Sequence, residues 1–244
     1  MKLLAVETST ERCSVALALG ADVHVDEIDA GQRHSTLLNG MIVDVLGRQG
    51  LTVRDIEGLA FGSGPGSFTG LRIGCSVVQG MAFALGLEVA PVGTLDALAE
   101  QAGADCPDAG RIITALDARM GETYFAAWAR DADRWHPVVS PCLLRADALP
   151  SLPGSDWVAI GSAFDRHEYV AAHFAPQVAR TLHDRLPSAR DVAALALRIF
   201  ARGEAVSPED ALPLYIRDKV AMTIDERRAL KAGPTEHAAM AVKP

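Results

Sequence analysis

The chain has 244 residues, of which 49% are hydrophobic and 22% are charged, a balance that excludes wholesale disorder and collagen-like or coiled-coil architectures. The net charge of −8 comes from residues 1–110, which carry 6 basic and 14 acidic side chains, whereas residues 111–244 carry 17 of each. A protein that binds nucleic acid on its own normally has a basic face, and aromatic residues, at 5%, are too few for a base-stacking platform.

Hydrophobic periodicity in the first hundred residues predicts a three-stranded meander that is followed by alternating helices and strands. Strands are predicted at residues 2–7, 12–19, 22–29, 58–62 and 87–92. Helices are predicted at residues 34–48 and 72–85 and from Thr94 onward. The first three strands must be antiparallel, because only short turns connect them.

A second strand-rich pattern begins after residues 104–110, a stretch with Pro and Gly that we interpret as a domain junction. Strands are predicted at residues 111–117, 122–130, 138–139 and 157–160, and a helix at residues 190–201. The repetition predicts an α/β protein with two lobes, residues 1–105 and 106–218, and a tail at residues 219–244.

The sequence predicts a cytoplasmic protein without membrane contact. Glu7 interrupts the apolar start of the chain before the core of a signal peptide could form. The longest apolar stretch, residues 73–87, has 15 uncharged residues, fewer than the ~20 that cross a bilayer. The four cysteines form no CxxC pair, which is typical of a protein in a reducing compartment.

A glycine-rich loop at residues 62–74 joins a predicted strand to a predicted helix. Its sequence, Gly-Ser-Gly-Pro-Gly-Ser-Phe-Thr-Gly-Leu-Arg-Ile-Gly, would expose N–H groups at the positive end of a helix, which suits an anion. The loop lacks the Gly-Lys-Ser/Thr of a Walker A loop, the spacing of a dinucleotide fingerprint and the glycines of a nucleophile elbow. A tight turn that packs closely against the helix explains the same glycines, so both interpretations stay open.

An acidic residue followed by hydroxyl groups, Glu7-Thr-Ser-Thr, ends the first predicted strand. Such a sequence can hold a metal–nucleotide complex in two-domain phosphotransferases, and a polar hairpin turn explains it as well. Together with the loop, it gives the candidate phosphate-binding residues Glu7, Thr8, Ser9, Gly64, Gly66, Ser67, Thr69 and Gly70.

The histidines do not assemble a metal site. A zinc-protease helix needs HExxH, but His167 and His173 are six residues apart, and their rings would point about 120° apart on a helix. His34 has no His or Cys four residues further on, and we interpret it as a capping or interface residue. The sequence therefore predicts no catalytic residue and no metal ligand.

An apolar stripe on the first predicted helix has two interpretations. Leu37, Leu38, Met41, Ile42 and Val45 fall on one helical face, which is typical of a protein core. If Met41 points outward from an outer helix, the stripe would instead bind a partner.

Four blocks, in order along the chain, resemble the TsaB (YeaZ) family, the bacterial accessory subunits for making threonylcarbamoyladenosine in tRNA. The blocks are residues 3–17, 64–74, 116–124 and 211–217, and His34-Ser35 resembles the start of the family's first helix. The resemblance implies the actin/Hsp70/sugar-kinase (ASKHA) fold, an α/β architecture of two ribonuclease-H-like lobes with mixed sheets flanked by helices.

The resemblance also implies a function and partners. A member of this family is a non-catalytic scaffold that binds the catalytic paralogue TsaD and works with the ATPase TsaE. The complex transfers a threonylcarbamoyl group to the adenosine next to the anticodon of tRNAs that read codons starting with A, and tRNA is bound only through the complex. The scaffold has no cofactor of its own, ATP or ADP lies at the junction with the partner, and the isolated chain is a homodimer.

In this family the partner is contacted by the first two helices, which correspond to residues 34–48 and 67–85 here. The interface residues implied by the resemblance are His34, Leu37, Leu38, Met41, Ile42, Val45, Phe68, Leu71 and Arg72. We therefore predict that Asp in place of Leu38 or Met41 leaves a soluble monomer that no longer pairs.

Two alternative functions are retained. An ATP-dependent phosphotransferase of the same fold would use Glu7 and residues 62–70, and Glu7→Ala would then weaken nucleotide binding by the isolated chain. The family often has Asp at the position of Glu7, and the longer side chain argues against this role. A peptidase, a label once attached to relatives of this fold, is disfavoured by the failed HExxH spacing.

Overall fold

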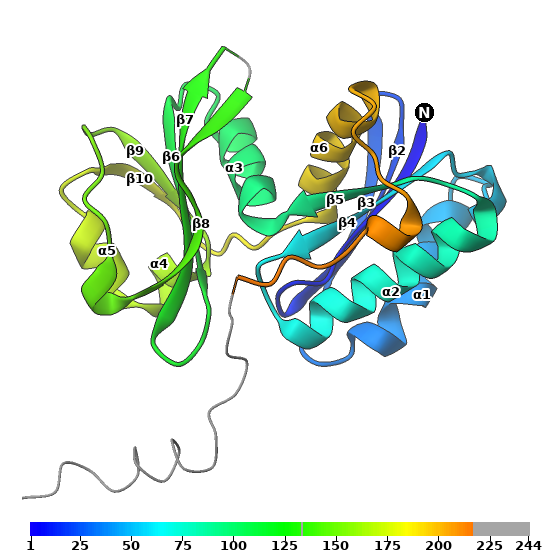
Figure 1. Ribbon diagram of the computed structural model, residues 1–244, viewed down its shortest axis with the longest axis horizontal. Helices are drawn as coiled ribbons and strands as arrows, with labels where there is room; N and C mark the ends of the chain where they lie inside the picture. The colour runs from blue at the N-terminus through cyan, green and yellow to red at the C-terminus, as the bar shows by residue number, and fades with distance from the viewer. Residues whose placement is uncertain (133, 217–244) are drawn as a thin grey trace, which may run out of the picture.

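The computed structural model describes residues 1–132 and 134–216 and shows two α/β lobes that lie side by side (Figure 1). The first lobe has a mixed sheet in the order β3-β2-β1-β4-β5, and the second has one in the order β10-β9-β6-β7-β8. In both lobes the first strand is antiparallel to the second and parallel to the fourth. The prediction of two lobes with mixed sheets flanked by helices is therefore confirmed.

The strands of the two sheets follow one another along the chain. The first sheet consists of β1 (Lys2–Glu7), β2 (Arg12–Leu19), β3 (Asp22–Asp29), β4 (Gly58–Gly64) and β5 (Val89–Gly93). The second sheet consists of β6 (Arg111–Asp117), β7 (Glu122–Asp131), β8 (Arg134–Arg145), β9 (Trp157–Ile160) and β10 (Val178–Leu182). The predicted antiparallel meander of β1, β2 and β3 is present, as their short turns require.

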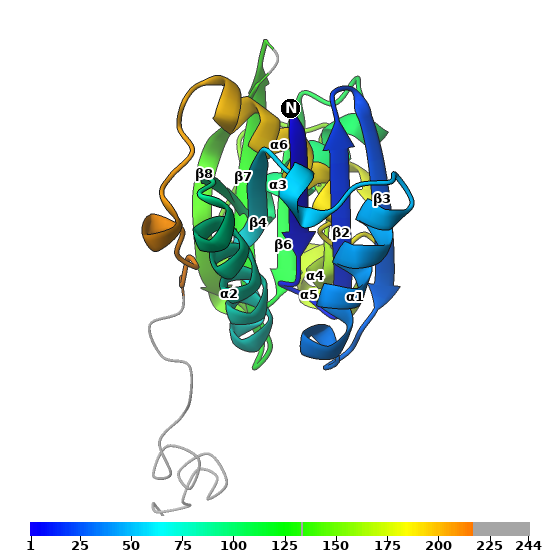
Figure 2. The same ribbon diagram turned by 90° about the vertical axis from the view of Figure 1, so that its right-hand side faces the viewer.

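Helices cover both faces of each sheet. α1 (His34–Gly47) and α2 (Phe68–Leu85) lie side by side on the outer face of the first sheet, as Figure 2 shows. α6 (Ala189–Ala201) covers the inner face of the first sheet and packs against α3 (Thr94–Asp105), which lies on the second sheet. The remaining short elements are α4 (Ser162–Arg166), α5 (Glu168–Phe174) and the 3-10 turns η1 (Val53–Asp55), η2 (Ala146–Ala148) and η3 (Pro208–Asp210).

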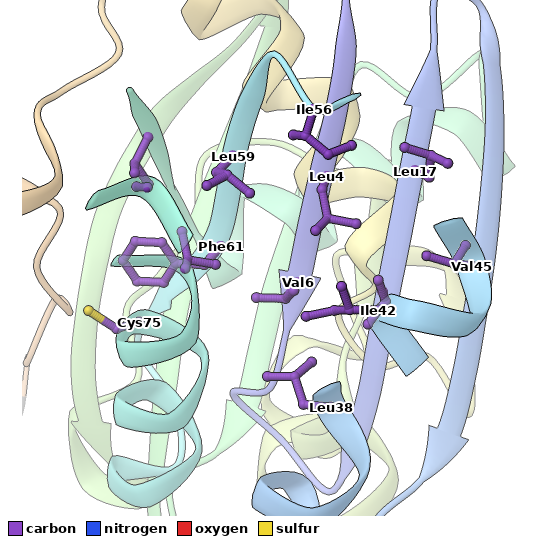
Figure 3. Close-up of a cluster of buried hydrophobic side chains, with 14 of the residues drawn as sticks. Leu4, Val6, Leu17, Leu38, Ile42, Val45, Ile56, Leu59, Phe61 and Cys75 are labelled. Atoms are coloured by element: carbon purple, nitrogen blue, oxygen red, sulfur yellow. The ribbon is translucent and has the colours of Figure 1, made fainter. Parts of the chain in front are cut away.

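The central strand β1 is buried on both sides, because each of its faces meets a different set of helices. Leu4 and Val6 point toward the outer helices, where they pack with Leu38, Ile42 and Val45 of α1 (Figure 3). Alternate residues of a strand point to opposite faces, so their neighbours in sequence point toward α6. This double burial explains why β1 has an unbroken apolar sequence between Lys2 and Glu7.

The inner face of the first sheet is lined by small side chains that let α6 approach closely. Ala5 and Ala16 pack with Val192, Ala193 and Ala196 of this helix. α6 therefore completes the first lobe although it follows the second lobe in sequence. The prediction that residues 106–218 form a single lobe is wrong for this reason. The turn η3 also belongs to the first lobe, because it packs against α2.

One helix begins earlier than predicted, and three short elements had no prediction. α2 begins at Phe68, four residues earlier than predicted, because the Ser67 side chain caps it by accepting the Gly70 N–H at 3.3 Å. The elements α4, α5 and β10 were not predicted, since each is too short for a clear periodic pattern. Residues 217–244, which include the predicted tail at residues 219–244, lie outside the described residues.

α2 is the only helix in the described part of the chain that is long and apolar enough to cross a membrane, with a mean hydropathy of 1.3. The predicted apolar stretch was shorter, because it began at Ile73. One side of α2, which includes Val78 and Ala82, is buried on the first sheet. Length and composition alone are weak evidence for a membrane span, because buried helices of globular proteins pass the same test.

Candidate functional site

A cleft with a volume of about 540 Å³ opens between the two lobes. On the first lobe it is lined by the β1–β2 turn and by the glycine-rich loop before α2. On the second lobe it is lined by the turn between β6 and β7 and by α4. The polar side chains at its wall are those of Ser9, Thr10, Glu11, Gln32, His34, Ser67, Thr69, Asp117, Arg119, Tyr124, Ser162, Arg166 and Tyr215.

The glycines of the loop allow it to dock against the β1–β2 turn. A Cβ atom on Gly66 would lie 2.5 Å from the carbonyl oxygen of Ser9, and one on Gly70 would lie 2.0 Å from that of Thr8. Hydrogen bonds fix the contact, because the Ser67 N–H donates to Ser9 O at 2.7 Å and the Thr8 hydroxyl donates to Gly70 O at 2.8 Å. Close packing therefore accounts for these glycines, which favours the tight-turn interpretation of the loop.

Glu7 is buried beneath the loop and does not line the cleft. Its Oε1 accepts the Ser9 N–H at 2.5 Å, and its Oε2 has no hydrogen-bond partner among the described residues. Burial is the largest effect and raises the pKa of the Glu7 carboxyl group. The hydrogen bonds from Ser9 and Thr8 lower this pKa, but they do not cancel the effect of burial. A carboxyl group that is buried away from the cleft cannot bind a metal–nucleotide complex there.

The eight candidate phosphate-binding residues therefore separate into two groups. Five of them line the cleft, namely Ser9, Gly66, Ser67, Thr69 and Gly70. The other three, Glu7, Thr8 and Gly64, are buried in the first lobe. The N–H groups before α2 can still attract an anion, but the acidic residue of the predicted site is not in the cleft.

A chain of ion pairs that we call the Arg166 bridge connects the lobes across the cleft. Arg166 of α4 pairs with Glu11 of the β1–β2 turn and lies 3.6 Å from Asp117 at the end of β6. Asp117 also accepts the Arg119 N–H at 2.7 Å and a hydrogen bond from His167 Nε2 at 3.0 Å. Asp117 holds the same place in the second sheet as Glu7 in the first, but unlike Glu7 it lines the cleft, where its Oδ1 accepts both hydrogen bonds and its Oδ2 faces Arg166.

The two histidines of the failed HExxH pattern have separate structural roles. His167 lies before α5 and bonds to Asp117, whereas the Nε2 of His173 lies 3.1 Å from the carbonyl oxygen of Pro150. Residues 1–132 and 134–216 contain no group of three or more His, Cys, Asp or Glu side chains that could hold a metal ion.

The last described residues, 211–216, form a segment that we call the closing segment, which runs back along α2 (Figure 1). Cys75 Sγ lies 3.2 Å from the carbonyl oxygen of Ala211, and the Leu214 N–H donates to Ser63 O at 2.7 Å. At its end the Tyr215 hydroxyl accepts a hydrogen bond from Arg72 Nε at 3.0 Å. The closing segment thus ties α2 to the end of β4 and contributes to the cleft wall.

The nine predicted interface residues also differ in burial, and five of them belong to the interior. The buried residues are His34, Leu38, Ile42, Val45 and Leu71. Leu37 and Met41 are half-buried, and only Phe68 and Arg72 are exposed. The stripe on α1 is therefore core, as Figure 3 shows for Leu38, Ile42 and Val45. We therefore expect Asp at position 38 to destabilise the lobe, in place of the soluble monomer predicted from the sequence.

The outer surface of α1 and α2 carries a different set of apolar residues, which the sequence analysis missed. Val43 on α1 and Phe83 on α2 are 65% and 63% exposed. Gly40 and Gly80 lie on the same two helices, and a Cβ atom on either would meet nothing within 4 Å. The available signal was that Val43 and Phe83 are apolar residues outside the core-facing pattern of their helices.

Comparison with known proteins places these features in context. The family model of TsaD, tRNA N6-adenosine threonylcarbamoyltransferase, matches residues 28–224. The tRNA threonylcarbamoyladenosine biosynthesis protein TsaB of Escherichia coli strain K12 is 35% identical, over 91% of this chain and 96% of that protein. The Haemophilus influenzae protein of the same name is 32% identical, over 90% and 95% of the two chains. The structure of YeaZ from Pseudomonas aeruginosa is 34% identical with a TM-score of 0.77, covering 88% of this chain and 99% of that one.

Proposed function

Because the chain belongs to the TsaB family, we propose that it is a scaffold subunit required for threonylcarbamoyl transfer to tRNA. The modified position is the adenosine next to the anticodon of tRNAs that read codons starting with A. The observation that carries the proposal is the 35% identity to the Escherichia coli biosynthesis protein over 91% of the chain. As a subunit of a tRNA-modifying complex, the protein acts in the cytoplasm.

The chemistry of the cleft supports a role without catalysis. Glu7 is buried away from the cleft, and Asp117 is held by Arg166 and His167. Glu7 cannot reach a metal–nucleotide complex in the cleft, and Asp117 is already paired with basic groups, which argues against the phosphotransferase alternative. We propose that the chain has no cofactor of its own and that ATP or ADP lies at the junction with the catalytic partner.

The outer surface of α1 and α2 is the proposed contact with that partner. Exposed Val43 and Phe83 supply apolar area, and the open positions at Gly40 and Gly80 allow the backbone of another helix to come close. The proposed partners are the TsaD paralogue and the ATPase TsaE. A second copy of the chain occupies the same surface when the chain is alone, and tRNA is bound only through the complex.

Reconstitution tests this function directly. TsaD, TsaE and the threonylcarbamoyl-adenylate synthetase are combined with ATP, threonine, bicarbonate and unmodified tRNA, with and without this chain. We expect the modified nucleoside only when the chain is present, and no ATP hydrolysis by the chain alone. Modification that does not depend on the chain, together with ATP hydrolysis or phosphate transfer by the chain itself, would overturn the proposal in favour of a phosphotransferase.

A further inference from the structure

The two lobes meet at the contact between α3 and α6. The buried face of α3, which includes Leu98 and Ala102, belongs to the core of the second lobe. The buried face of α6, which includes Val192 and Ala196, belongs to the core of the first lobe. α3 also reaches the core of the first lobe through Ala97. The contact between α3 and α6 therefore joins the two lobes, and Figure 1 shows both helices between the two sheets.

A polar pair lies within this contact. Gln101 of α3 donates from Nε2 to Oδ2 of Asp191, in the first turn of α6, at 3.2 Å. Asp191 is only 5% exposed. The other amide atom, Gln101 Oε1, is buried and has no hydrogen-bond partner among the described residues. An ionised carboxylate offers acceptors only, so it cannot satisfy this second oxygen, whereas a protonated carboxyl group can donate to it.

The charges around Asp191 also favour its neutral form. Glu100 and Asp105 face it from α3, and Glu27 faces it from β3. Each of these acids already has its own basic partner: Arg198 pairs with Glu100, Arg185 with Asp105 and Arg12 with Glu27.

Arg190, on the same helix, and the positive end of α6 act in the opposite direction and favour the carboxylate. Burial is the largest effect, and together with the neighbouring acids it raises the pKa of Asp191 to about 7.

We propose that in mildly acidic solution Asp191 of the folded protein is protonated and its hydroxyl donates a hydrogen bond to Gln101 Oε1, so that an acid–amide pair with two hydrogen bonds holds α3 against α6. Loss of the proton leaves two oxygen atoms facing each other at the buried contact. The joint between the lobes is then weaker in alkaline than in acidic solution.

Asp191→Asn provides the matched variant. The Asn amide has one acceptor and one donor group, so it reproduces both hydrogen bonds but does not titrate. A raised folded-state pKa means that stability is complete below the unfolded-state pKa of about 4 and is lost as the pH rises toward 7. Urea unfolding should therefore show the unfolding constant of the wild type rising relative to the variant by up to about tenfold per pH unit in this range.

Two site-specific measurements complete the test. The Asp191 carboxyl carbon should titrate near pH 7 in the NMR spectrum of the folded chain. Hydrogen exchange in the first turn of α6, corrected for the intrinsic rate, should accelerate between pH 6 and pH 8.5 in the wild type and stay constant in Asp191→Asn. A carboxyl carbon that titrates near pH 4, or a constant ratio of unfolding constants, would overturn the proposal.

Discussion

Gly62 leaves the space that the carboxyl group of Glu7 fills, since a Cβ atom on Gly62 would lie 1.8 Å from Glu7 Oε2. Gly62→Ala should therefore lower the free energy of unfolding by about 1–3 kcal/mol, because the buried carboxyl group must move within a packed core. Urea denaturation measures the change. Glu7→Asp shortens the side chain, so the double variant should recover part of the loss, and a double variant with no recovery would contradict this explanation.

Gly80→Ala is the matched control for that substitution. Its Cβ atom would meet nothing within 4 Å, and Gly80 lies in the interior of α2 with an ordinary helical backbone. The variant should be as stable as the wild type or more stable by up to about 1 kcal/mol, because Ala loses less backbone entropy in a helix.

Leu38 and Val43 lie on opposite sides of α1 and should respond differently to truncation. Leu38 is 1% exposed, so Leu38→Ala should cost about 2–5 kcal/mol of stability through lost burial and the cavity left behind. Val43 is 65% exposed, so Val43→Ala should change stability by no more than about 0.5 kcal/mol. Equal losses in thermal or urea unfolding would mean that the two sides of α1 have been assigned incorrectly.

Phe83→Asp tests the proposed partner surface. A carboxylate buried against an apolar partner has no compensating charge, so binding of the TsaD paralogue and self-association should each weaken at least tenfold, or by about 1.4 kcal/mol. Sedimentation velocity and titration calorimetry measure the two effects. Val138→Asp, at an exposed apolar position on β8 of the second lobe, is the control and should bind normally. Unchanged binding by Phe83→Asp would place the partner elsewhere.

Acidification is expected to weaken the Arg166 bridge. Burial alone would raise the pKa of Asp117, but the Arg119 N–H, the His167 ring and the charge of Arg166 hold that pKa below its usual 3.8. A carboxylate with a lowered pKa contributes stability that is complete above about pH 4 and is lost as the pH falls through the folded-state value. Asp117→Asn should therefore be less stable than the wild type at neutral pH and should lose less stability on acidification. Asp22→Asn, an exposed substitution, should keep the wild-type acid dependence.

Removal of the closing segment should expose Cys75. A chain that stops after Asp210 lacks the carbonyl of Ala211 that covers this thiol, whereas a chain that stops after Ile216 retains it. Cys75, 4% exposed in the intact chain, should react with a thiol reagent only in the shorter chain. Cys13 is fully buried elsewhere in the same core and should stay protected in both. Protection of Cys75 in the shorter chain would show that the closing segment does not shield it.

The sequence predicts the elements that have a clear period and short connections. β1, β2 and β3 alternate and are joined by tight turns, and α1 has a continuous apolar stripe, so all four were found with bounds within a residue. The stripe identified which side of α1 faces the core. Val43 lies outside the stripe, and one apolar residue on a helix is too weak a signal to define an outer surface. The Arg166 bridge could not be predicted for another reason. Glu11 and Arg166 are 155 residues apart in the sequence, and no local pattern connects them.

The path of the chain has a consequence for synthesis on the ribosome. The chain leaves the first sheet after β5, builds the second sheet, and returns to add α6 and the closing segment. The nascent first sheet therefore exposes its alanine-lined face while roughly a hundred further residues are added, which takes about 5–20 s at ordinary bacterial elongation rates. The second sheet emerges without interruption, so the lobe that is translated first is completed last.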